Sequence, residues 1–423
     1  MPAELADPLT LPCGITLKNR IAKAAMTEGI ATPENRATSD HARLYRRWAQ
    51  GGSGLLITGN VQVDRRFLER PGNITIDGNG GLDALADYAR AGSENGAHIW
   101  MQINHPGRQA GTGTDQFVSP SENNLPGKEG RTRALKPDEI EDICARFIHV
   151  AQVAHDTGFT GIQIHAAHGY LLSQFLSPLT NRRDDQWGGS LKNRSRLLLD
   201  IVRGIRAKEG ANFAVSVKLN SADFQKGGLT EEESFQIVRW LCEAGIDLLE
   251  VSGGNYESQI MVGRDENHEL VKKKPASTTA REAYFLEFAA RLRPQVSVPL
   301  MVTGGFRSRQ AMEQALLANE LDLIGLARPL CIDPDFANQL LSGNTDRLPS
   351  PDDAISLNRS TVGDVDEATL HAIEVQASIS YYFNQVRRLA AGEESEQEID
   401  WLEQLNRHVA FDAAANKRYL AAA

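Results

Sequence analysis

The sequence predicts an α/β fold in which eight strand-helix units close into a (β/α)8 TIM barrel. Three observations predict it: short apolar runs alternate with longer amphipathic segments from residue 19 onward, eight such runs occur, and the 423 residues exceed the roughly 250 that one barrel needs. A doubly wound sheet is the alternative, but its glycine-rich dinucleotide loop should follow an early strand, and none does. The barrel is therefore favoured.

The eight apolar runs are short, as strands are, and rich in apolar side chains. They span Ile21–Met26, Gly54–Val61, Ala97–Asn104, Phe159–His165, Phe213–Asn220, Leu248–Gly253, Pro299–Gly304 and Leu321–Leu326. Amphipathic helices are expected at Ser39–Gln50, Leu82–Glu94, Pro137–Thr157, Asn193–Lys208, Thr230–Glu243, Ala280–Leu292, Ser308–Ala318 and Pro334–Leu341. Thr230 and Glu233 have the spacing of a capping box.

Two segments are additions to a minimal barrel. Before the first strand, Leu11–Asn19 has a central turn signal at Gly14 and predicts a hairpin that caps the N-terminal mouth. The loop Gly107–Lys136 is rich in Gly, Ser, Asn and Pro and is too long for a plain connector. We expect this loop to cover the active site.

A helical extension is predicted after the barrel. We divide the chain into a barrel domain at 1–343, a polar connecting segment at 344–364 and a helical extension at 365–423. One helix should end at Gly392 and bury Val375, Ile379, Tyr382, Val386 and Leu389. A second should begin with a capping box of Ser395 and Glu398 and carry Ile399, Leu402, Leu405 and Val409. The hairpin must bury this stripe on its own barrel, which is favoured, or on a partner subunit as a dimer arm.

Composition argues against a nucleic-acid or membrane protein. The 45 Lys and Arg residues against 55 Asp and Glu give a net charge of −10 without a long basic run. No apolar stretch approaches the roughly 20 residues of a membrane span, and the N-terminus lacks a signal-peptide pattern. The four cysteines are scattered and form neither a metal-ligand pair nor a disulfide framework. We therefore expect a soluble cytoplasmic protein without a metal.

A cluster of hydrogen-bonding side chains follows the fourth apolar run. His165-Ala-Ala-His168-Gly-Tyr170 lies at the C-terminal end of that run and on the turn beyond it, which is the end of a barrel that carries catalytic residues. Two imidazoles and a phenol at this spacing can hold an oxygen and deliver a proton. The alternative is a pair of core histidines that bond only to backbone groups.

Polar residues also mark the ends of other runs. Lys218 lies in an apolar strand and must face a polar centre, an anion or solvent, because burying it unpaired is costly. The seventh and eighth runs end in glycine-containing loops that match the phosphate site common after these barrel strands, where Arg328 would neutralise the charge. The residues expected to line this mouth are Thr27, Gly59, Gln102, His165, His168, Tyr170, Lys218, Gly304, Gly305 and Arg328.

Taken together, these motifs resemble the Old Yellow Enzyme family of FMN-dependent ene reductases. The motifs that match in order are Asn19-Arg-Ile through Met26-Thr27, Gln102, His165-Ala-Ala-His168-Gly-Tyr170 with Gln174-Phe-Leu-Ser-Pro178, Asn181-Arg-Arg, Trp187-Gly-Gly-Ser with Asn193-Arg, and the two phosphate loops. The likeness covers roughly residues 8 to 342, and the stretch from His165 through Arg194 is its most specific part.

The resemblance implies where FMN would bind. Thr27 would donate near flavin O4, Gln102 would bind the pyrimidine edge, and Lys218 would lie near N1 and O2, where a cation stabilises the anionic reduced flavin. The residues implied to contact FMN are Ala25, Met26, Thr27, Gly59, Gln102 and Lys218 at the isoalloxazine ring, and Gly304, Gly305, Ala327 and Arg328 at the phosphate.

The resemblance also implies a reaction. NADH or NADPH would reduce the flavin, which would then reduce a small activated alkene, an enone or nitroalkene, in a ping-pong cycle. His165 and His168 would bind the carbonyl or nitro oxygen while hydride leaves flavin N5, and Tyr170 would protonate the α-carbon. A homodimer or higher homo-oligomer is compatible with the helical extension.

Three features depart from the family pattern. Thr27 occurs here with a His-His pair, whereas one branch of the family pairs threonine with His-Asn and another pairs cysteine with His-His. Lys218 stands where many relatives have arginine, so its hydrogen bonds to the flavin should differ. The tail after Asp364 has no counterpart in the minimal family barrel.

Other functions remain open from the residues alone. Lys218 could form a Schiff base in a lyase or aldolase, or the barrel could bind flavin without catalysis. His165 and His168 could be metal ligands, although no carboxylate partner is evident. The iron-sulfur members of the family need a cysteine cluster beyond the barrel, where only Cys331 lies.

Overall fold

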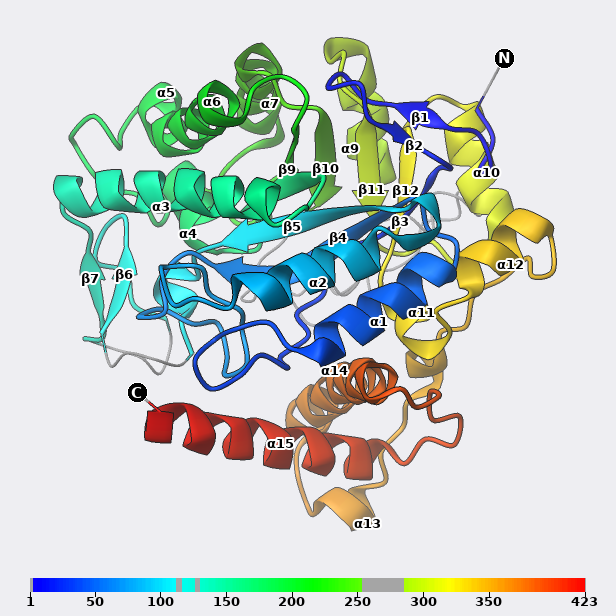
Figure 1. The fold of residues 1–423 in the computed structure, drawn as a ribbon. Helices are drawn as coiled ribbons and strands as arrows, with labels where there is room; N and C mark the ends of the chain where they lie inside the picture. The colour runs from blue at the N-terminus through cyan, green and yellow to red at the C-terminus, as the bar shows by residue number, and fades with distance from the viewer. Residues whose placement is uncertain (1–2, 112–115, 126–129, 253–284, 423) are drawn as a thin grey trace.

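The computed structural model describes residues 3–111, 116–125, 130–252 and 285–422, and its central element is a closed barrel of parallel strands (Figure 1). The barrel strands are β3 Ile21–Lys23, β4 Leu55–Gln62, β5 His98–Asn104, β8 Gly161–Ala166, β9 Ala214–Asn220, β10 Leu248–Ser252, β11 Leu300–Thr303 and β12 Leu323–Leu326. Each pairs with the next, and β12 pairs with β3. The predicted barrel and its eight strands are confirmed; Gly253, the predicted end of one strand, lies outside the described residues.

Helices surround the barrel. They are α1 Ser39–Gln50, α2 Leu82–Gly92, α3 Pro137–Asp156, α4 Leu171–Leu176, α5 Leu191–Arg194, α6 Arg196–Glu209, α7 Glu231–Ala244, α9 Leu286–Leu292, α10 Arg309–Leu317, α11 Arg328–Ile332 and α12 Phe336–Ser342. The predicted helices are confirmed with small shifts at their ends. The prediction Asn193–Lys208 was wrong in one respect, because α5 ends at Arg194 and α6 begins after Ser195. The first residues of the predicted helix Ala280–Leu292 lie outside the described residues.

The start of α7 shows how the sequence specifies a helix end. Thr230 Oγ1 accepts a hydrogen bond of 3.2 Å from the Glu233 N–H, and Glu233 Oε2 accepts one of 3.4 Å from the Thr230 N–H. These two bonds satisfy backbone donors that the first helical turn leaves unpaired. The predicted capping box is therefore confirmed.

The N-terminal hairpin closes one end of the barrel. Strands β1 Leu9–Thr10 and β2 Thr16–Leu17 pair antiparallel around a turn in which Gly14 has φ +89°. Leu9 and Leu17 pack in one cluster with Leu55, Trp100 and other residues at the starts of barrel strands. The predicted cap on the N-terminal mouth is confirmed, and the strand-end residues predicted to form the site lie at the opposite end of the barrel.

The long loop after β5 reaches that opposite end. It contains β6 Phe117–Ser119 and β7 Thr132–Ala134, which pair with each other. Before them, Gln109 Nε2 donates a hydrogen bond of 2.9 Å to the carbonyl oxygen of His168. The described part of this loop therefore touches the predicted catalytic turn, and its role as a cover stays a prediction.

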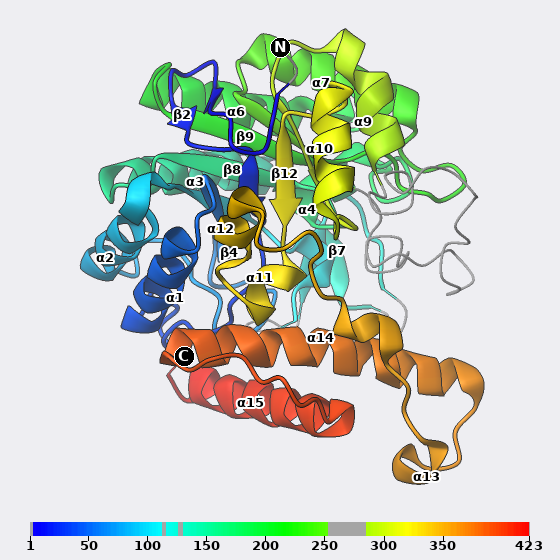
Figure 2. The ribbon, with the colours of Figure 1, turned by 90° about the vertical axis from the view of Figure 1, so that its right-hand side faces the viewer.

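The helical extension packs on its own barrel. After the short helices η5 Pro351–Ala354 and α13 Arg359–Val362, α14 Glu367–Ala391 lies against α1 and α11, and α15 Trp401–Ala422 lies against α14 (Figures 1 and 2). Gly392 ends α14 with φ +87°, as predicted. The favoured arrangement of the hairpin is the one observed.

The predicted start of the last helix was wrong, and so was Val409 as a member of its buried stripe; Ile399, Leu402 and Leu405 are half-buried. Ser395 does not cap α15; Asp400 Oδ1 accepts from the N–H groups of Leu402 and Glu403 instead, at 3.1 and 3.0 Å. Val409 is 58% exposed, whereas Gln404 is buried and bonds to Asn384 on α14. Because the contact is partly polar, a pattern of apolar residues could not reveal which face is buried.

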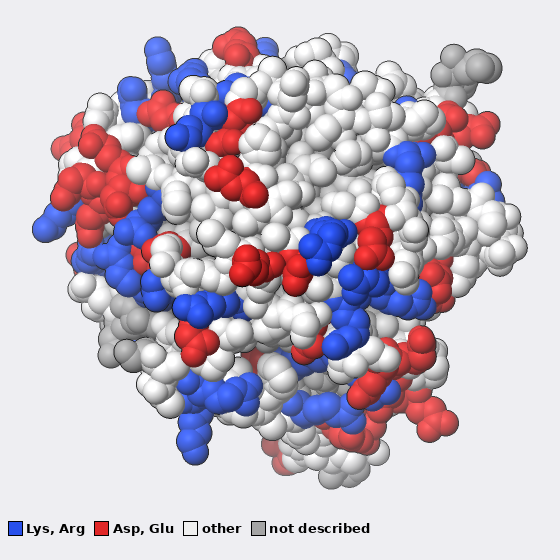
Figure 3. Space-filling model, viewed as in Figure 1, with Lys and Arg blue, Asp and Glu red and all other residues white. Residues whose placement is uncertain are grey.

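The surface carries both signs of charge. Lys and Arg are interspersed with Asp and Glu over the face in Figure 3, and the basic side chains there do not form one broad patch. Among the described residues, none of the helices combines the length and apolar character needed to cross a bilayer.

Candidate active site

The predicted His165–His168–Tyr170 cluster is assembled in the structure at the C-terminal end of β8. The His165 ring lies 5.0 Å from the His168 ring and 4.9 Å from the Tyr170 ring, both edge-on. His165 and Tyr170 are almost fully buried. His165 Nδ1 accepts a hydrogen bond of 3.2 Å from the Ala167 N–H, so a neutral ring carries its proton on Nε2. The cluster thus presents imidazole and phenol donors within one small space.

The turn that forms this cluster is strained. His168 has φ +61° and Gly169 follows with φ +75°. A left-handed backbone is unusual for a residue other than glycine, costs about 1 to 3 kcal/mol, and is concentrated at functional sites. The backbone N–H of His168 donates to Asn220 Oδ1 at 3.2 Å, and the ring nitrogen Nε2 of His168 lies 2.7 Å from Ser252 Oγ. These contacts from β9 and β10 hold the turn in place.

Both histidines are held in the neutral form. Burial lowers the pKa of His165 well below its ordinary value, and the neighbouring His168 ring and the positive charge of Lys218 act in the same direction. Burial and Lys218 likewise lower the pKa of His168. At neutral pH the pair therefore offers polar N–H donors without a fixed positive charge.

A buried polar chain crosses the barrel just below the cluster. Lys218 is the register partner of both His165 and Glu250 on the adjacent strands, and its Nζ lies 3.0 Å from Glu250 Oε1. At this distance the two side chains form a buried ion pair. Gln163 Nε2 donates to Glu250 Oε2 at 2.8 Å, and Gln102 Nε2 donates to Gln163 Oε1 at 2.7 Å. The predicted Gln102 and Lys218 are thereby connected.

A second group of contacts connects Thr27 with Tyr170. Glu69 Oε2 accepts hydrogen bonds of 3.0 Å from Thr27 Oγ1 and from Asn60 Nδ2. Asn60 Nδ2 also lies 3.4 Å from the Tyr170 hydroxyl. Arg70 Nε lies 3.4 Å from the other oxygen of Glu69. The structure therefore places a carboxylate between two residues that the sequence assigned separate roles.

Gly59 is buried in β4 and is closely surrounded by Met26, Thr27 and Glu28. The pairing register of β4 and β5 shifts between Ile57 and Asn60, and a Cβ atom at Gly59 would lie 2.3 Å from Glu28 Oε2 and 2.5 Å from the Met26 carbonyl oxygen. Glu28 Oε1 accepts from the Gly59 N–H at 2.8 Å. Glycine is required here because no side chain fits.

The predicted phosphate residues lie at the ends of β11 and β12. Gly304 and Gly305 have φ +115° and +87°, a backbone that suits a loop approaching an anion. Arg328 begins α11, and its guanidinium makes a 2.5 Å ion pair with Asp352 of the connecting segment. Ala25 and Ala327 both pack against the interior of the barrel.

The residues at this mouth fit FMN. Gln102 and Lys218 can supply hydrogen bonds and charge to the ring, the positive φ angles of Gly304 and Gly305 suit a loop that approaches an anion, and Arg328 suits a phosphate. In the described part of the chain, Asn220 Nδ2 and Thr303 Oγ1 are buried at the ends of β9 and β11 without hydrogen-bond partners, as expected where a polar ligand completes a site.

Four residues of these networks were missed from the sequence: Asn60, Glu69, Gln163 and Glu250. Glu250 has the same kind of signal as Lys218, because a carboxylate in the apolar strand Leu248–Ser252 needs a positive partner. Gln163 lies two residues before His165 and therefore shares its face of β8. Glu69 lies in a loop with no local signal, since only the fold brings it to Thr27.

Acid should destabilise the protein through another buried histidine. Burial lowers the pKa of His105 from 6.5 to about 4. Between these values the unfolded chain binds more protons than the folded protein, so the free energy of unfolding falls as pH falls, by up to about 1.4 kcal/mol per pH unit. In denaturant unfolding between pH 6.5 and 4, His105→Gln should reduce the slope of stability against pH by the share of this one histidine, whereas His149→Gln, at an exposed position, should leave the slope unchanged. An unchanged slope in His105→Gln would contradict the prediction.

The chain belongs to the NADH:flavin oxidoreductase / NADH oxidase family, whose model matches residues 4–347. The NADH-dependent flavin oxidoreductase iliE of Hypocrea jecorina is 36% identical over 353 residues, which cover 77% of this chain and 86% of that protein. Membership makes the protein an NAD(P)H-dependent oxidoreductase with FMN as its flavin.

Solved structures share the fold. A 2-naphthoyl-CoA reductase in complex with 2-naphthoyl-CoA has a TM-score of 0.71 and 27% identity, and the match covers 80% of this chain and 52% of that chain. An old yellow enzyme homologue from Zymomonas mobilis has a TM-score of 0.68 and 24% identity, covering 86% of this chain and 99% of that chain. The family match confirms the predicted resemblance, and the old yellow enzyme homologue shares the fold.

Proposed function

We propose that this protein is an ene reductase that takes electrons from NADH or NADPH and reduces the activated C=C bond of an enone or nitroalkene in a ping-pong cycle. The observation that carries the proposal is the His165–His168–Tyr170 cluster. It combines two neutral imidazoles with a phenol, and the ring centres of His168 and Tyr170 lie 5.0 and 4.9 Å from that of His165. Such a group can bind an oxygen that gains negative charge and can deliver one proton.

Each residue of the cluster has a distinct proposed role. Bound FMN supplies the hydride. His165 and His168 donate N–H groups to the carbonyl or nitro oxygen, which fixes the alkene and draws electron density away from its β-carbon. Tyr170 donates its proton to the α-carbon. Lys218 and Gln102 hold the ring that carries the electrons, and the Glu250–Gln163 chain holds both side chains in position.

A Schiff-base lyase or aldolase has less support. In that reaction Lys218 would have to attack a carbonyl carbon as a free amine. Its Nζ instead lies beside the Glu250 carboxylate inside the barrel, and the lyase reading gives Tyr170 and the Gly304–Gly305 loop no task.

The test is an absorption spectrum of the purified protein, followed under anaerobic conditions by NADH or NADPH and then by 2-cyclohexenone. Flavin bands that bleach with the nicotinamide cofactor and return with the enone would support the proposal. A reduced flavin that oxygen reoxidises but that enones and nitroalkenes leave unchanged would contradict ene reduction without contradicting flavin binding.

His165 can be tested by ligand binding alone. His165→Ala should weaken binding of a phenol by about 10- to 100-fold, because a hydrogen bond to a charged oxygen is lost. The measurement is the long-wavelength charge-transfer band that phenols produce with the flavin of this family. His149→Ala, at an exposed site on α3, is the control. An unchanged band in His165→Ala would remove this residue from the oxygen-binding site.

A further inference from the structure

The connecting segment after the barrel is bound to both predicted phosphate loops. At the β11 loop, the Leu348 N–H donates to the Arg307 carbonyl oxygen at 2.7 Å, and Arg307 Nε donates to Ser350 Oγ. At the β12 loop, Arg328 makes its 2.5 Å ion pair with Asp352. One short stretch of chain therefore connects the two loops that are proposed to hold the FMN phosphate.

The helical extension in turn holds Asp352. The Tyr382 hydroxyl on α14 donates to Asp352 Oδ1 at 2.6 Å, and Ser378 Oγ lies 3.4 Å from Oδ2. The Arg328 guanidinium lies 5.8 Å from the centre of the Tyr382 ring. The Asp352 side chain is 11% exposed and that of Arg328 is 30% exposed, so the carboxylate is the better anchored of the two.

The charge of Asp352 is maintained in this environment. Burial alone would raise the pKa of Asp352, but Arg328 and the Tyr382 hydroxyl together hold it below its ordinary value. Conversely, burial and the adjacent carboxylate raise the pKa of Tyr382 far above its ordinary value, so this phenol stays a donor. Tyr382, Asp352 and Arg328 therefore form a chain of hydrogen bonds and charge contacts that runs from α14 to the phosphate loop.

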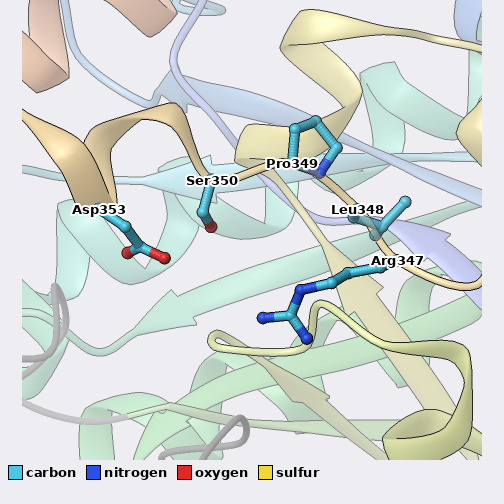
Figure 4. Close-up of a pocket in the computed structure, with 5 residues that line it drawn as sticks. All are labelled: Arg347, Leu348, Pro349, Ser350 and Asp353. Atoms are coloured by element: carbon cyan, nitrogen blue, oxygen red, sulfur yellow. The ribbon is translucent and has the colours of Figure 1, made fainter.

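The connecting segment also forms a hollow beside Asp352. Arg347, Leu348, Pro349, Ser350 and Asp353 line a cavity of about 380 Å³ (Figure 4). Asp353 is exposed and lines the hollow. The neighbouring Asp352 has an 11% exposed side chain and pairs with Arg328. Two adjacent carboxylates thus have opposite surroundings, which provides a matched pair for experiment.

We propose that Asp352 and Tyr382 are positioning residues for Arg328, so that the helical extension completes the phosphate end of the FMN site. The inference rests on the proposed placement of the FMN phosphate at Arg328. A guanidinium has five N–H donors in a rigid fork, so one edge can be held by a carboxylate while another binds a phosphate. Both positioning residues lie beyond residue 347, where the family match ends, so the extension supplies a contact from outside the shared barrel.

The phosphate contribution is measured by comparing FMN with riboflavin, which has the same ring and no phosphate. We would titrate the apoprotein with each and take the ratio of the riboflavin and FMN dissociation constants. Asp352→Ala should lower this ratio about tenfold, the effect of one hydrogen bond to a charged group, by weakening FMN and leaving riboflavin unchanged. Tyr382→Phe should lower it about threefold. Asp353→Ala, with the same change of charge one residue away, should leave it unchanged.

The sign of the effect decides between positioning and competition. If Asp352 merely neutralised Arg328, its removal would tighten FMN binding and raise the ratio, and that result would overturn the proposal, as would an unchanged ratio. Should Asp352→Ala fail to fold, Tyr382→Phe decides by the same criterion. Arg328→Gln is the reference. If this variant leaves the ratio unchanged, the FMN phosphate does not bind at Arg328. If Arg328→Gln lowers the ratio and Asp352→Ala and Tyr382→Phe do not, only the role of the extension is overturned.

A second measurement uses the reciprocity of coupled binding. If the extension strengthens FMN binding through Arg328, FMN must stabilise the docked extension by the same factor. Hydrogen exchange of the amides in α14 should therefore be slower in the FMN-loaded protein than in the riboflavin-loaded protein, and Asp352→Ala should remove the difference. Equal exchange in both forms of the unaltered protein would contradict the proposal.

Discussion

Tyr170→Phe is expected to slow reoxidation of the reduced flavin by 2-cyclohexenone by about 10²- to 10⁴-fold, the usual contribution of a positioned proton donor. Phenylalanine keeps the ring that packs edge-on against His165 and removes only the hydroxyl. Reduction of the flavin by NADH or NADPH needs no proton from this position, so its rate should change little. Stopped-flow absorbance of the two half-reactions measures both rates separately.

The control for this variant is Tyr419→Phe. Tyr419 lies on α15, and its hydroxyl contacts the Arg65 carbonyl oxygen at 3.3 Å, far along the chain from the cluster. It should leave both half-reactions unchanged. An equal loss in both half-reactions of Tyr170→Phe would refute its role as proton donor and point instead to a disturbed flavin site.

Lys218→Met is expected to lower the free energy of unfolding of the apoprotein by about 3 to 5 kcal/mol. The side chains of Lys218 and Glu250 are 6% and 0% exposed, so removal of the cation leaves a carboxylate buried in the barrel without a countercharge. Glu250→Gln should have a comparable cost, because it leaves the Lys218 cation buried without its carboxylate. The double variant should be markedly more stable than the sum of the two losses predicts, because neither charge then remains unpaired.

Denaturant unfolding of the four proteins completes this double-mutant cycle. The exposed pair Arg309–Glu313 on α10 has 30% and 37% exposed side chains and provides the comparison. Its removal should cost no more than about 0.5 kcal/mol. Additive losses for Lys218 and Glu250 would show that the two charges do not compensate each other.

The fold could be predicted because its signals are local. Each barrel strand is a short apolar run, and each helix buries a periodic face, so both can be recognised without knowing which strands pair. The hairpin cap could be predicted for the same reason, from a turn at Gly14 between short extended segments. The error at α15 has a specific cause: Gln404 and not Val409 faces α14, and a buried polar contact has no hydrophobic period.

The candidate site was only partly predictable. His165, His168 and Tyr170 are neighbours in sequence, and Lys218 is conspicuous in an apolar strand, so these residues could be selected before the structure was known. Glu69 and Asp352 could not, since their partners Thr27 and Arg328 belong to other elements of the fold and are distant in the chain. Such residues acquire a meaning only when the barrel closes and brings the loops together.

The N-terminal hairpin has a consequence for the order of events during turnover. Leu9 and Leu17 fill the lower opening of the barrel together with Leu55 and Trp100, so molecules that reach the His165 cluster must arrive and leave by the upper opening. In the proposed ping-pong cycle, the nicotinamide cofactor and the enone therefore enter through the same opening and bind one after the other. Excess enone should accordingly inhibit by occupying the place of the nicotinamide cofactor, with inhibition that more cofactor relieves.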